Sequence, residues 1–376
     1  MRVLHFYKTC ALNSTGGVEV FMDTLCNATA DFGVENTILS LADKPESTPV
    51  NLPRYQVIQA KQNVFVASTG FSISAFSQFK RLAEQADIIH YHFPNPFADI
   101  LHFCCQVKKP TVLTYHSDIV KQKLLLKLYQ PLMHRFLHSV DRIIATSPNY
   151  FATSSRLQAY KDKVNVIPIA INKVNCSVVS PAKIQYWQNK LTQPFFLFIG
   201  ALRYYKGLHF LLDAVKATDL QLVLAGTGGT ESTLKAQARQ SALHNVYFPG
   251  LVSDEDKAAL LHLCYGFVFP SHLRSEAFGI ALLEAASYGK PLISCEIGTG
   301  TSFINVDQQT GLVVEPGSPD ALRHAMQYLL ANPVKAAEFG RNAEARHKSL
   351  FTLDKQAKAY VEVYKHVLHK KQRAGS

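Results

Sequence analysis

Long hydrophobic runs are the first feature that this sequence lacks. Although 47% of its 376 residues are hydrophobic, no uninterrupted apolar stretch reaches the roughly 18 residues that a membrane-spanning helix requires. Residues 1–8 mix apolar and basic side chains over too short a length to resemble a signal peptide. The 18% share of charged residues is too low for a disordered chain. We therefore expect a globular protein of the cytoplasm that does not cross a membrane.

Paired cysteines and metal-binding patterns are also missing. The seven cysteines form no C-x-x-C motif, their number is odd, and most lie in apolar segments. We expect them to be small buried core residues in a reducing compartment. The histidines lack the spacing of metal ligands, and no Asp-x-Asp pair accompanies the polar motifs described below. The sequence therefore predicts a site without a metal ion or another cofactor.

Negative charge is scarce, with 28 acidic against 39 basic residues and a formal net charge of +11. Such an excess favours an anionic partner, which is nucleic acid, a membrane surface or a small ligand. The basic residues are spread over both halves of the chain, and no zinc finger, RNA-binding signature or basic zipper is present. We predict no nucleic-acid partner, which leaves an anionic ligand and an anionic membrane surface.

The chain does contain two series in which strand-like and helix-like segments alternate. Apolar strand patterns occur at 2–7, 36–41, 87–91, 111–115, 141–146, 164–168, 195–199, 220–225, 246–248, 267–269, 292–295 and 312–314. Helical patterns occur at 18–31, 72–85, 97–107, 119–138, 148–160, 208–217, 231–241 and 254–263. Alternation of this kind predicts an α/β fold in which helices cover both faces of a parallel sheet.

The two series are separated by residues 171–194, which carry no strong strand pattern and are interpreted as a linker region. A chain of this length suits two domains, which we place at 1–175 and 176–352. The segment 353–368 is amphipathic, and we expect residues 353–376 to pack back near the first domain, with 373–376 as a loose end. Two such halves predict a central cleft, since ligands bind at the carboxyl ends of parallel strands.

The most informative stretch, 270–289, reads P-S-H-L-R-S-E-A-F-G-I-A-L-L-E-A-A-S-Y-G. It predicts a polar loop after a buried strand, followed by the start of a helix that Gly289 and Pro291 end. The free N–H groups and the helix dipole at such a junction suit an anion. We expect Glu276 and Glu284 to bind a polyhydroxylated ligand. The alternative is that Glu276 caps the helix and Glu284 is a solvated side chain on its polar face.

Four further polar spots follow predicted strands. They are Gly16-Gly17, the segment 115–118 with His116, the segment 200–207 with Arg203 and Lys206, and the segment 225–228. Two cations beside a helix N-terminus fit a pyrophosphate better than a monoanion. The alternatives are ordinary surface charge for Arg203 and Lys206, a simple turn for the glycine pair, and a satisfied structural group for His116.

Together these motifs resemble the retaining glycosyltransferases of family GT4. The motifs are G-G-V-E at 16–19, H-S-D at 116–118, G-A-L-R-Y-Y-K-G at 200–207 and two glutamates separated by seven residues at 276–284. They occur in the family's order and span nearly the whole chain. The resemblance implies the GT-B fold, in which two Rossmann-like, doubly wound domains face a central cleft. It also implies sugar transfer from a nucleotide diphosphate sugar, with retention at the anomeric carbon and no metal ion.

The resemblance assigns catalytic roles to Arg203, Lys206, Glu276 and His116. The two cations would hold the donor diphosphate and stabilise the leaving charge, Glu276 would bind hydroxyls of the transferred sugar, and His116 would contact that sugar near the reaction centre. In one departure, the family often has an arginine directly after the first glycine of the third motif, where this chain has Ala201. We expect Arg203 to replace it, the alternative being that Lys206 acts alone.

The resemblance also implies a set of donor-binding residues. The backbone of Phe278-Gly279-Ile280 would contact the sugar and phosphate, and Glu284 would bind the ribose. The first domain would contribute Gly16 and Gly17, which would approach the diphosphate. No carboxylate stands out as a covalent nucleophile, so we expect a front-face reaction in which the leaving phosphate takes the acceptor proton.

The segments 1–9 and 114–122 look most like bacterial enzymes that build O-antigen and other surface polysaccharides on a lipid carrier. This resemblance implies a mannosyltransferase of lipopolysaccharide biosynthesis that uses GDP-mannose and a lipid-linked glycan acceptor. It places the protein on the inner face of the bacterial plasma membrane. A UDP-sugar donor with a different acceptor stays open, as does a GT-B protein without transferase activity, such as a nucleotide-sugar epimerase or binding protein. The oligomeric state is also open.

The segment 121–137 reads K-Q-K-L-L-L-K-L-Y-Q-P-L-M-H-R-F-L and predicts a basic amphipathic helix. Such a helix suits an anionic membrane surface, where it would meet a lipid-linked acceptor. The alternative is a helix packed on its own domain with a basic outer face. Pro131 predicts a kink in either case.

Overall fold

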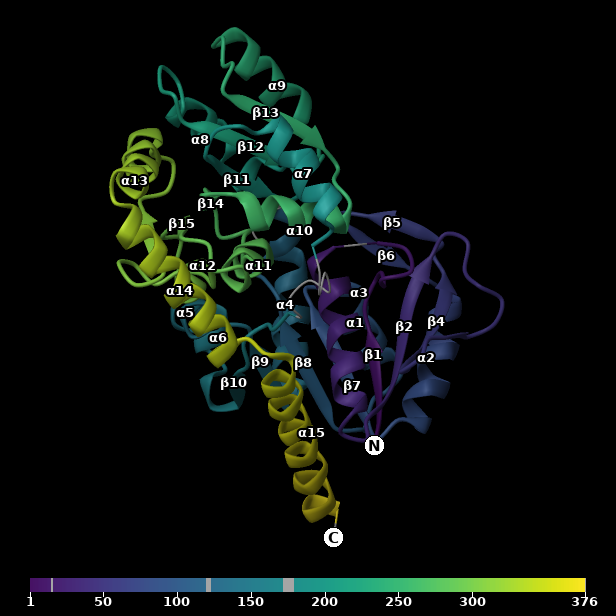
Figure 1. Ribbon diagram of the computed structural model, residues 1–376. Coiled ribbons are helices and arrows are strands. Elements are labelled where there is room, and N and C mark those ends of the chain that lie inside the picture. The colour runs from purple at the N-terminus through teal and green to yellow at the C-terminus, as the bar shows by residue number, and fades with distance from the viewer. Residues whose placement is uncertain (15, 120–122, 172–178, 376) are drawn as a thin grey trace. The chain divides into compact units, whose positions relative to one another are not determined.

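The computed structural model in Figure 1 describes residues 1–14, 16–119, 123–171 and 179–375. The chain forms two compact units, one made of Met1–Ile169 with Leu353–Ser376 and the other of Ala170–Thr352. The domain boundary expected after residue 175 falls outside the described residues, as do Lys121 and Cys176. The predicted cleft concerns the placement of the two units and stays a prediction.

The first unit is built on an eight-stranded sheet in the order β10-β9-β8-β7-β1-β2-β4-β3. All neighbouring pairs are parallel except β3 and β4. The strands of this sheet are β1 (Arg2–Phe6), β2 (Glu35–Ala42), β3 (Val50–Asn51), β4 (Tyr55–Lys61), β7 (Ile88–Phe93), β8 (Thr111–Tyr115), β9 (Arg142–Ala145) and β10 (Val164–Val166). A separate hairpin consists of β5 (Val64–Val66) and β6 (Thr69–Phe71). The strand order reverses at β1, so the switch point of this sheet lies between β1 and β7.

The helices of the first unit differ from the prediction in two places. They are α1 (Gly17–Ala30), α2 (Ser74–Gln85), α3 (Pro96–Cys104), α4 (Lys123–Ser139), α5 (Pro148–Thr153), α6 (Ser155–Gln158), the 3-10 helix η1 (Lys161–Lys163) and α15 (Leu353–Gly375). The single helix predicted at 148–160 is wrong, because Ser154 has an extended backbone and its side chain caps α6 by accepting from the Leu157 amide. The loose end predicted from residue 373 is also wrong, since α15 runs to Gly375.

The C-terminal helix α15, yellow in Figure 1, completes the core of the first unit and packs against α1. Tyr360 and Tyr364 are fully buried. Their hydroxyls bond Thr114 of β8 at 2.9 Å and His90 of β7 at 2.7 Å. The last described helix is therefore part of the hydrogen-bonded interior of this unit.

Four strands of the first unit have no counterpart in the predicted series, namely β3, β4, β5 and β6. For β4, the longest of them, the reason lies in its polar residues. This strand buries the side chain of Gln59, which donates a hydrogen bond to the Asn13 carboxamide oxygen at 2.5 Å. A buried glutamine interrupts the apolar pattern from which strands are recognised.

The second unit contains a six-stranded parallel sheet in the order β13-β12-β11-β14-β15-β16. Its strands are β11 (Phe195–Ile199), β12 (Gln221–Ala225), β13 (Val246–Gly250), β14 (Gly266–Phe269), β15 (Leu292–Cys295) and β16 (Gly311–Val314). Because the order reverses at β11, the switch point lies between β11 and β14. β11 reads F-F-L-F-I and every residue is buried, as expected for a strand covered on both faces.

The helices of the second unit include one inside the predicted linker. They are α7 (Pro181–Lys190), the 3-10 helix η2 (Tyr204–Lys206), α8 (Leu208–Ala214), α9 (Glu231–Gln240), α10 (Asp254–Leu263), α11 (Ile280–Ser287), α12 (Thr301–Ile304), α13 (Pro319–Ala331) and α14 (Pro333–Leu350). α7 corrects the interpretation of 171–194 as a linker, because Trp187 is buried and donates to Asp256 of α10 at 3.0 Å. Among the described residues, no helix is long and apolar enough to cross a membrane.

Candidate functional site

Two loops meet at the switch point of the second unit, one after β11 and one after β14. The His272 amide donates to the Tyr205 carbonyl at 3.0 Å. Gly207 has a φ of +69°, and a Cβ built on it would lie 2.1 Å from the Pro270 carbonyl oxygen. Only glycine allows this approach, because any side chain would force the two loops apart. Gly207, which follows Lys206, is therefore a point of close approach between the two loops.

An ion pair joins the same two loops. Lys206 Nζ bonds Glu276 Oε2, and each side chain is only 11% exposed. Ser271, which is fully buried, donates to the same carboxylate oxygen at 3.4 Å. Lys206 Nζ also lies 4.4 Å from the centre of the Phe269 ring. Burial and the Glu276 carboxylate raise the pKa of Tyr205 to about 12, so its hydroxyl stays protonated beside this pair. Two residues that the sequence singled out separately are therefore in direct contact.

The alternative that Glu276 caps α11 is wrong. The N-cap is Gly279, with a φ of +100°, and among the described residues the helix has no side-chain cap hydrogen bond. Phe278 is buried, and Ile280 opens the helix directly after the cap. The loop therefore directs Glu276 toward Lys206. At the N-terminus of α11, only the backbone amides of Gly279 and Ile280 are offered to a ligand by these three residues.

Arg203 differs from Lys206 in its surroundings. It precedes η2 in an extended conformation and is exposed. In the part of the chain that the structure describes, its guanidinium has no ion-pair partner. The structure thus provides one mostly buried cation that is already paired and one exposed cation that is free to meet an anion. Whether Arg203 replaces the cation missing at Ala201 stays a prediction.

Glu284 lies one turn into α11 and is not a solvated side chain. Its carboxylate bonds Lys257 of α10 at 2.9 Å, and the glutamate side chain is 16% exposed. Burial of Lys257 would lower its pKa, but Glu284 and then Asp254 raise it above the ordinary value. The sequence did not single out Lys257, because nothing in its pattern indicates which helix packs beside α11.

In the first unit, His116 follows β8 directly and is 8% exposed. Its amide donates to the Phe93 carbonyl at 3.0 Å, and its Nε2 lies 3.0 Å from His92 Nδ1. Burial lowers the pKa of His116 to about 3, so the ring is neutral at physiological pH. The ring of Phe21, from α1, meets it edge-on at 4.9 Å. His116 Nε2 therefore has a structural hydrogen-bond partner, as expected if His116 is a satisfied structural group. Among the described residues, its Nδ1 has no partner and can bond a ligand.

Gly16 and Gly17 form the junction between the β1 loop and α1. Gly16 is the N-cap and Gly17 the first helical residue. A Cβ on Gly16 would lie 2.4 Å from Glu19 Oε2, so glycine leaves room for this carboxylate to fold back on the loop. Glu19 is buried and accepts from Thr9 Oγ1 at 2.5 Å. The sequence motif G-G-V-E thus includes a buried carboxylate whose position was not predicted.

The predicted residues fall into two groups, one in each unit. Lys206, Glu276, Phe278, Gly279, Ile280 and Glu284 lie on the β11 and β14 loops and on α11, together with the exposed Arg203. Gly16, Gly17 and His116 follow β1 and β8 in the first unit. Both groups lie at carboxyl ends of parallel strands, where ligands of open α/β sheets bind.

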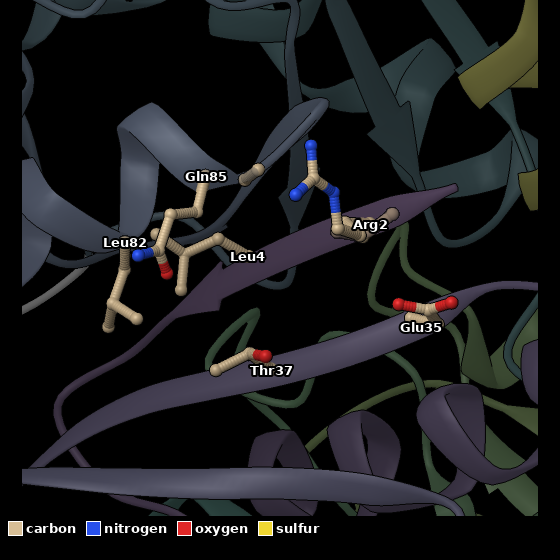
Figure 2. Close-up of a pocket in the computed structure, with 8 residues that line it drawn as sticks. Arg2, Leu4, Glu35, Thr37, Leu82 and Gln85 are labelled. Atoms are coloured by element: carbon tan, nitrogen blue, oxygen red, sulfur yellow. The ribbon is translucent and has the colours of Figure 1, made fainter.

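A pocket at the opposite end of the first sheet contains none of these residues. Figure 2 shows Arg2 and Leu4 of β1, Glu35 and Thr37 of β2, and Leu82 and Gln85 of α2 around it. Arg2 and Glu35 are the first residues of their strands, so this pocket opens at the amino-terminal edge. Arg2 is already engaged, since its guanidinium bonds Asp87 at 3.2 Å. We assign no function to this pocket.

Potential metal ligands come together once among the described residues. His5, His90 and His92 are buried, and their ligand atoms lie within 4.8 Å of one another. Each of their ring nitrogens already has a hydrogen-bond partner at 2.7 to 3.2 Å. A metal ion would have to displace these partners. The expectation of metal-independent chemistry itself stays a prediction.

Comparison with known proteins identifies both halves of the chain. Residues 15–173 match the family model "Glycosyltransferase Family 4", and residues 180–346 match "Glycosyl transferases group 1". D-rhamnosyltransferase WbpZ of Pseudomonas aeruginosa is 53% identical over 94% of this chain and 92% of its own length. O-antigen chain mannosyltransferase C of Escherichia coli is 47% identical over 99% of this chain and its whole length.

The fold has similar solved structures at low sequence identity. Sucrose-phosphate synthase from Thermosynechococcus elongatus matches with a TM-score of 0.81 and 20% identity over 98% of this chain and 99% of that one. WaaG, a glycosyltransferase involved in lipopolysaccharide biosynthesis, matches with a TM-score of 0.69 and 16% identity over 95% and 98%. These neighbours bear out the predicted GT-B fold. The two family models and the two near relatives, which span almost the whole chain, show that the protein belongs to glycosyltransferase family 4.

Proposed function

We propose that this glycosyltransferase moves a sugar of the manno configuration, with mannose as the first choice, from a GDP-sugar onto a lipid-linked glycan. We place the reaction in the synthesis of a bacterial O-antigen or related surface polysaccharide. The two near relatives are named as a mannosyltransferase and a D-rhamnosyltransferase. D-Rhamnose is mannose without the hydroxyl at C6, so both names point to the same ring configuration. Family membership sets aside the epimerase and the binding protein.

The observation that carries this proposal is the pair of Lys206 and Glu276 at the switch point between β11 and β14. It places a cation and a hydrogen-bond acceptor within contact of each other, which matches the two ends of a diphosphate–sugar bond. In the free protein, Glu276 neutralises Lys206 in a mostly buried position. A diphosphate would share the ammonium group, while the Glu276 carboxylate would accept hydroxyl groups of the sugar.

The remaining residues have complementary roles in this proposal. The exposed Arg203 adds a second, unpaired cation for the developing negative charge on the leaving diphosphate. The N-terminus of α11 adds amide donors from Gly279 and Ile280. Glu284, held by Lys257, presents a carboxylate oxygen to the ribose. The bond from C1 to the phosphate oxygen breaks, the acceptor oxygen bonds C1 on the same face, and the acceptor proton passes to the departing phosphate.

The lipid-linked acceptor and the membrane surface are supported by exposed apolar side chains of the first unit. In α4, Leu125 is 49% and Leu128 is 77% exposed beside the exposed Lys127. The hairpin of β5 and β6 exposes Val64, Phe65 and Val66. Apolar side chains next to basic ones are typical of surfaces that bind anionic bilayers.

The other half of α4 supports the packing alternative, because Met133, Phe136 and Leu137 are buried. We therefore propose that α4 docks on its own unit through its C-terminal half and meets the membrane through its N-terminal half. This arrangement would hold the protein as a peripheral enzyme on the inner face of the plasma membrane.

Thermal denaturation with GDP, UDP or ADP at equal millimolar concentration tests the donor. A nucleotide at 100 times its dissociation constant adds about 2.7 kcal/mol of stability and raises the melting temperature. We expect a shift with GDP, followed by transfer from GDP-mannose to a lipid-linked acceptor, with GDP-D-rhamnose as the competing donor. A shift with UDP alone would support the UDP-sugar alternative, and the absence of any shift would contradict the nucleotide-sugar proposal.

A further inference from the structure

A line of four buried polar side chains leads from the interior of the first unit to His116. Asn36 Oδ1 lies 3.1 Å from His5 Nε2, His5 Nδ1 lies 3.2 Å from His92 Nε2, and His92 Nδ1 lies 3.0 Å from His116 Nε2. Asn36 is 3% exposed, and His5 and His92 are fully buried. The line crosses three neighbouring strands, β2, β1 and β7, and ends after β8. Three of its members, Asn36, His5 and His92, had no role in the predicted site.

The inner end of this line has a fixed orientation. The Asn36 side-chain amide donates to the Cys26 carbonyl at 3.1 Å and to Thr29 Oγ1 at 3.0 Å. A carbonyl oxygen can only accept a hydrogen bond. The Thr29 hydroxyl donates its proton to the Leu25 carbonyl at 2.8 Å, so toward Asn36 it can also only accept. The nitrogen of Asn36 must therefore face these two groups, and its oxygen must face His5.

This orientation determines which nitrogen carries the proton in every ring along the line. Asn36 Oδ1 can only accept, so His5 Nε2 carries a proton. A neutral imidazole has one N–H, so His5 Nδ1 is bare and accepts from His92 Nε2. The same step leaves His92 Nδ1 bare, and it accepts from His116 Nε2. The proton of His116 is thereby directed inward, and its Nδ1 is bare.

The surroundings keep the three rings neutral. Burial lowers the pKa of His5 to about 4 and of His116 to about 3, and it lowers the pKa of His92 well below its ordinary value. Phe21 packs edge-on against both His92 and His116. A second proton on any ring would place a charge in this apolar setting and would break the direction of the line.

We propose that Asn36, His5 and His92 are positioning residues that hold His116 in the Nε2–H form, so that its Nδ1 serves the transfer reaction only as a hydrogen-bond acceptor. Among the described residues, none bonds this Nδ1. Its ligand is a hydroxyl group of the sugar substrate, which donates to Nδ1. The identity of this ligand rests on the proposed function, whereas the protonation pattern does not.

His90 provides a matched control within the same cluster. Its ring lies 4.5 Å from the His92 ring and 4.7 Å from the His5 ring, and it is equally buried. Its nitrogens bond Tyr364 and Thr114 and do not join the line. A role in packing alone would be shared by His90, whereas a role in fixing the proton of His116 would not.

The first experiment reads the protonated nitrogens directly, by 1H–15N correlation spectra of the imidazoles in the full chain labelled with 15N-histidine. Single histidine substitutions assign the signals. We expect His5, His92 and His116 to be neutral and protonated at Nε2 at pH 7. Protonation of His116 at Nδ1, or a charged ring at any of the three positions, would overturn the proposal. Displacement of the Nε2–H signals by added Zn²⁺ would also overturn it, in favour of a metal site.

The second experiment compares three variants of the same cluster. His92→Phe keeps an aromatic ring but breaks the line, and we expect kcat to fall about tenfold, the loss of one oriented hydrogen bond. His92→Gln supplies one donor and one acceptor and should recover most of kcat. His90→Gln should leave kcat and the His116 tautomer unchanged. Equal losses from His92→Phe and His90→Gln, or no recovery in the His92→Gln variant, would reduce the line to a packing feature.

Failure of this inference can be distinguished from failure of the proposed function. The thermal shift with GDP reports on the second unit, whose Lys206 and Glu276 do not belong to the histidine line. A normal shift with GDP together with a wrong His116 tautomer contradicts only the positioning role. The expected tautomer without any nucleotide shift contradicts only the proposed donor.

Discussion

The two units of this chain have different polar groups at the carboxyl ends of their parallel strands, charged in the second unit and neutral in the first. At the switch point of the second unit, the polar groups are charged, mostly buried and paired, as in Lys206 with Glu276. In the first unit, the polar groups are neutral imidazoles in a buried line, with His5 on β1, His92 on β7 and His116 directly after β8. A charged pair can reorganise around an anion, whereas a neutral line can only present one donor or acceptor. Under the proposed function, the charged pair of the second unit would bind the diphosphate and hydroxyl groups of the sugar, whereas His116 of the first unit would add a single hydrogen-bond acceptor for one hydroxyl group.

The largest expected effect comes from removing the cation of the charged pair. Lys206→Met should lower the rate of transfer by about 10² to 10³, because the developing charge on the leaving diphosphate loses a preorganised partner. It should also destabilise the second unit by about 3 kcal/mol, since Glu276 would remain as an uncompensated, mostly buried charge. Steady-state kinetics and urea denaturation measure the two effects.

The double variant with Lys206→Met and Glu276→Gln separates stability from catalysis. We expect it to recover most of the lost stability, because no unpaired charge remains, while transfer stays low. A double variant that also recovers transfer would show that the pair has only a structural role.

The second prediction concerns pH and should affect mainly the first unit. The pKa values of His5 and His116 are lowered by burial to about 4 and about 3, and those of His90 and His92 are well below the ordinary value. The unfolded chain binds protons at these sites below about pH 6.5, whereas the folded chain does not. The free energy of unfolding should therefore decrease as the pH falls below about 6.5, and the decrease should continue down to the lowered pKa values of the folded chain.

Hydrogen exchange tests this prediction for each unit separately, because protection factors report local stability. Between pH 6.5 and 5, protection should fall strongly in β1, β7 and β8. It should fall less in β11 and β14, because burial also lowers the pKa values of His209 and His272 but these two side chains are only partly buried. Above pH 6.5 these histidines should contribute no pH dependence. An equal loss of protection in both units would contradict the contrast between them.

The smallest expected effect concerns Arg203, which is exposed and has no ion-pair partner among the described residues. Arg203→Met should leave stability within about 0.5 kcal/mol of the original, because the side chain has no folded-state partner to lose. The KM for the donor should rise about tenfold if the guanidinium bonds the diphosphate. An unchanged KM would mean that Lys206 alone holds the diphosphate, and Arg203→Lys would then also be neutral.

Much of the fold could be read from the sequence, since buried parallel strands are short apolar runs and their helices have a clear period. The strands that were missed include β4 with its buried Gln59, a polar residue that only tertiary contacts explain. The loops with Lys206 and Glu276 were recognisable by their charged residues after apolar strands. Their direct contact was not, because it depends on β11 and β14 being neighbours although β12 and β13 intervene in sequence.

The line of Asn36, His5, His92 and His116 could not be predicted for the same reason, since it joins residues from separate strands. His90 and His92 are two residues apart on β7, so the sequence places them on one face of a strand. His5 joins them because β1 pairs with β7 and sets His5 opposite His90. No local pattern around Asn36 indicates that its amide ends the line. The chemistry of single loops was therefore predictable, whereas hydrogen-bonded groups drawn from several strands were not.

The place of α15 in the first unit has a consequence for the order in which the protein is made. The second unit lies within the sequence of the first, and Tyr360 and Tyr364 supply hydroxyls that bond Thr114 and His90. During synthesis from the N-terminus, the interior of the first unit must wait for residues 353–375, while the second unit is already complete. On the ribosome, the half of the enzyme that emerges first should therefore be the last to reach its final state.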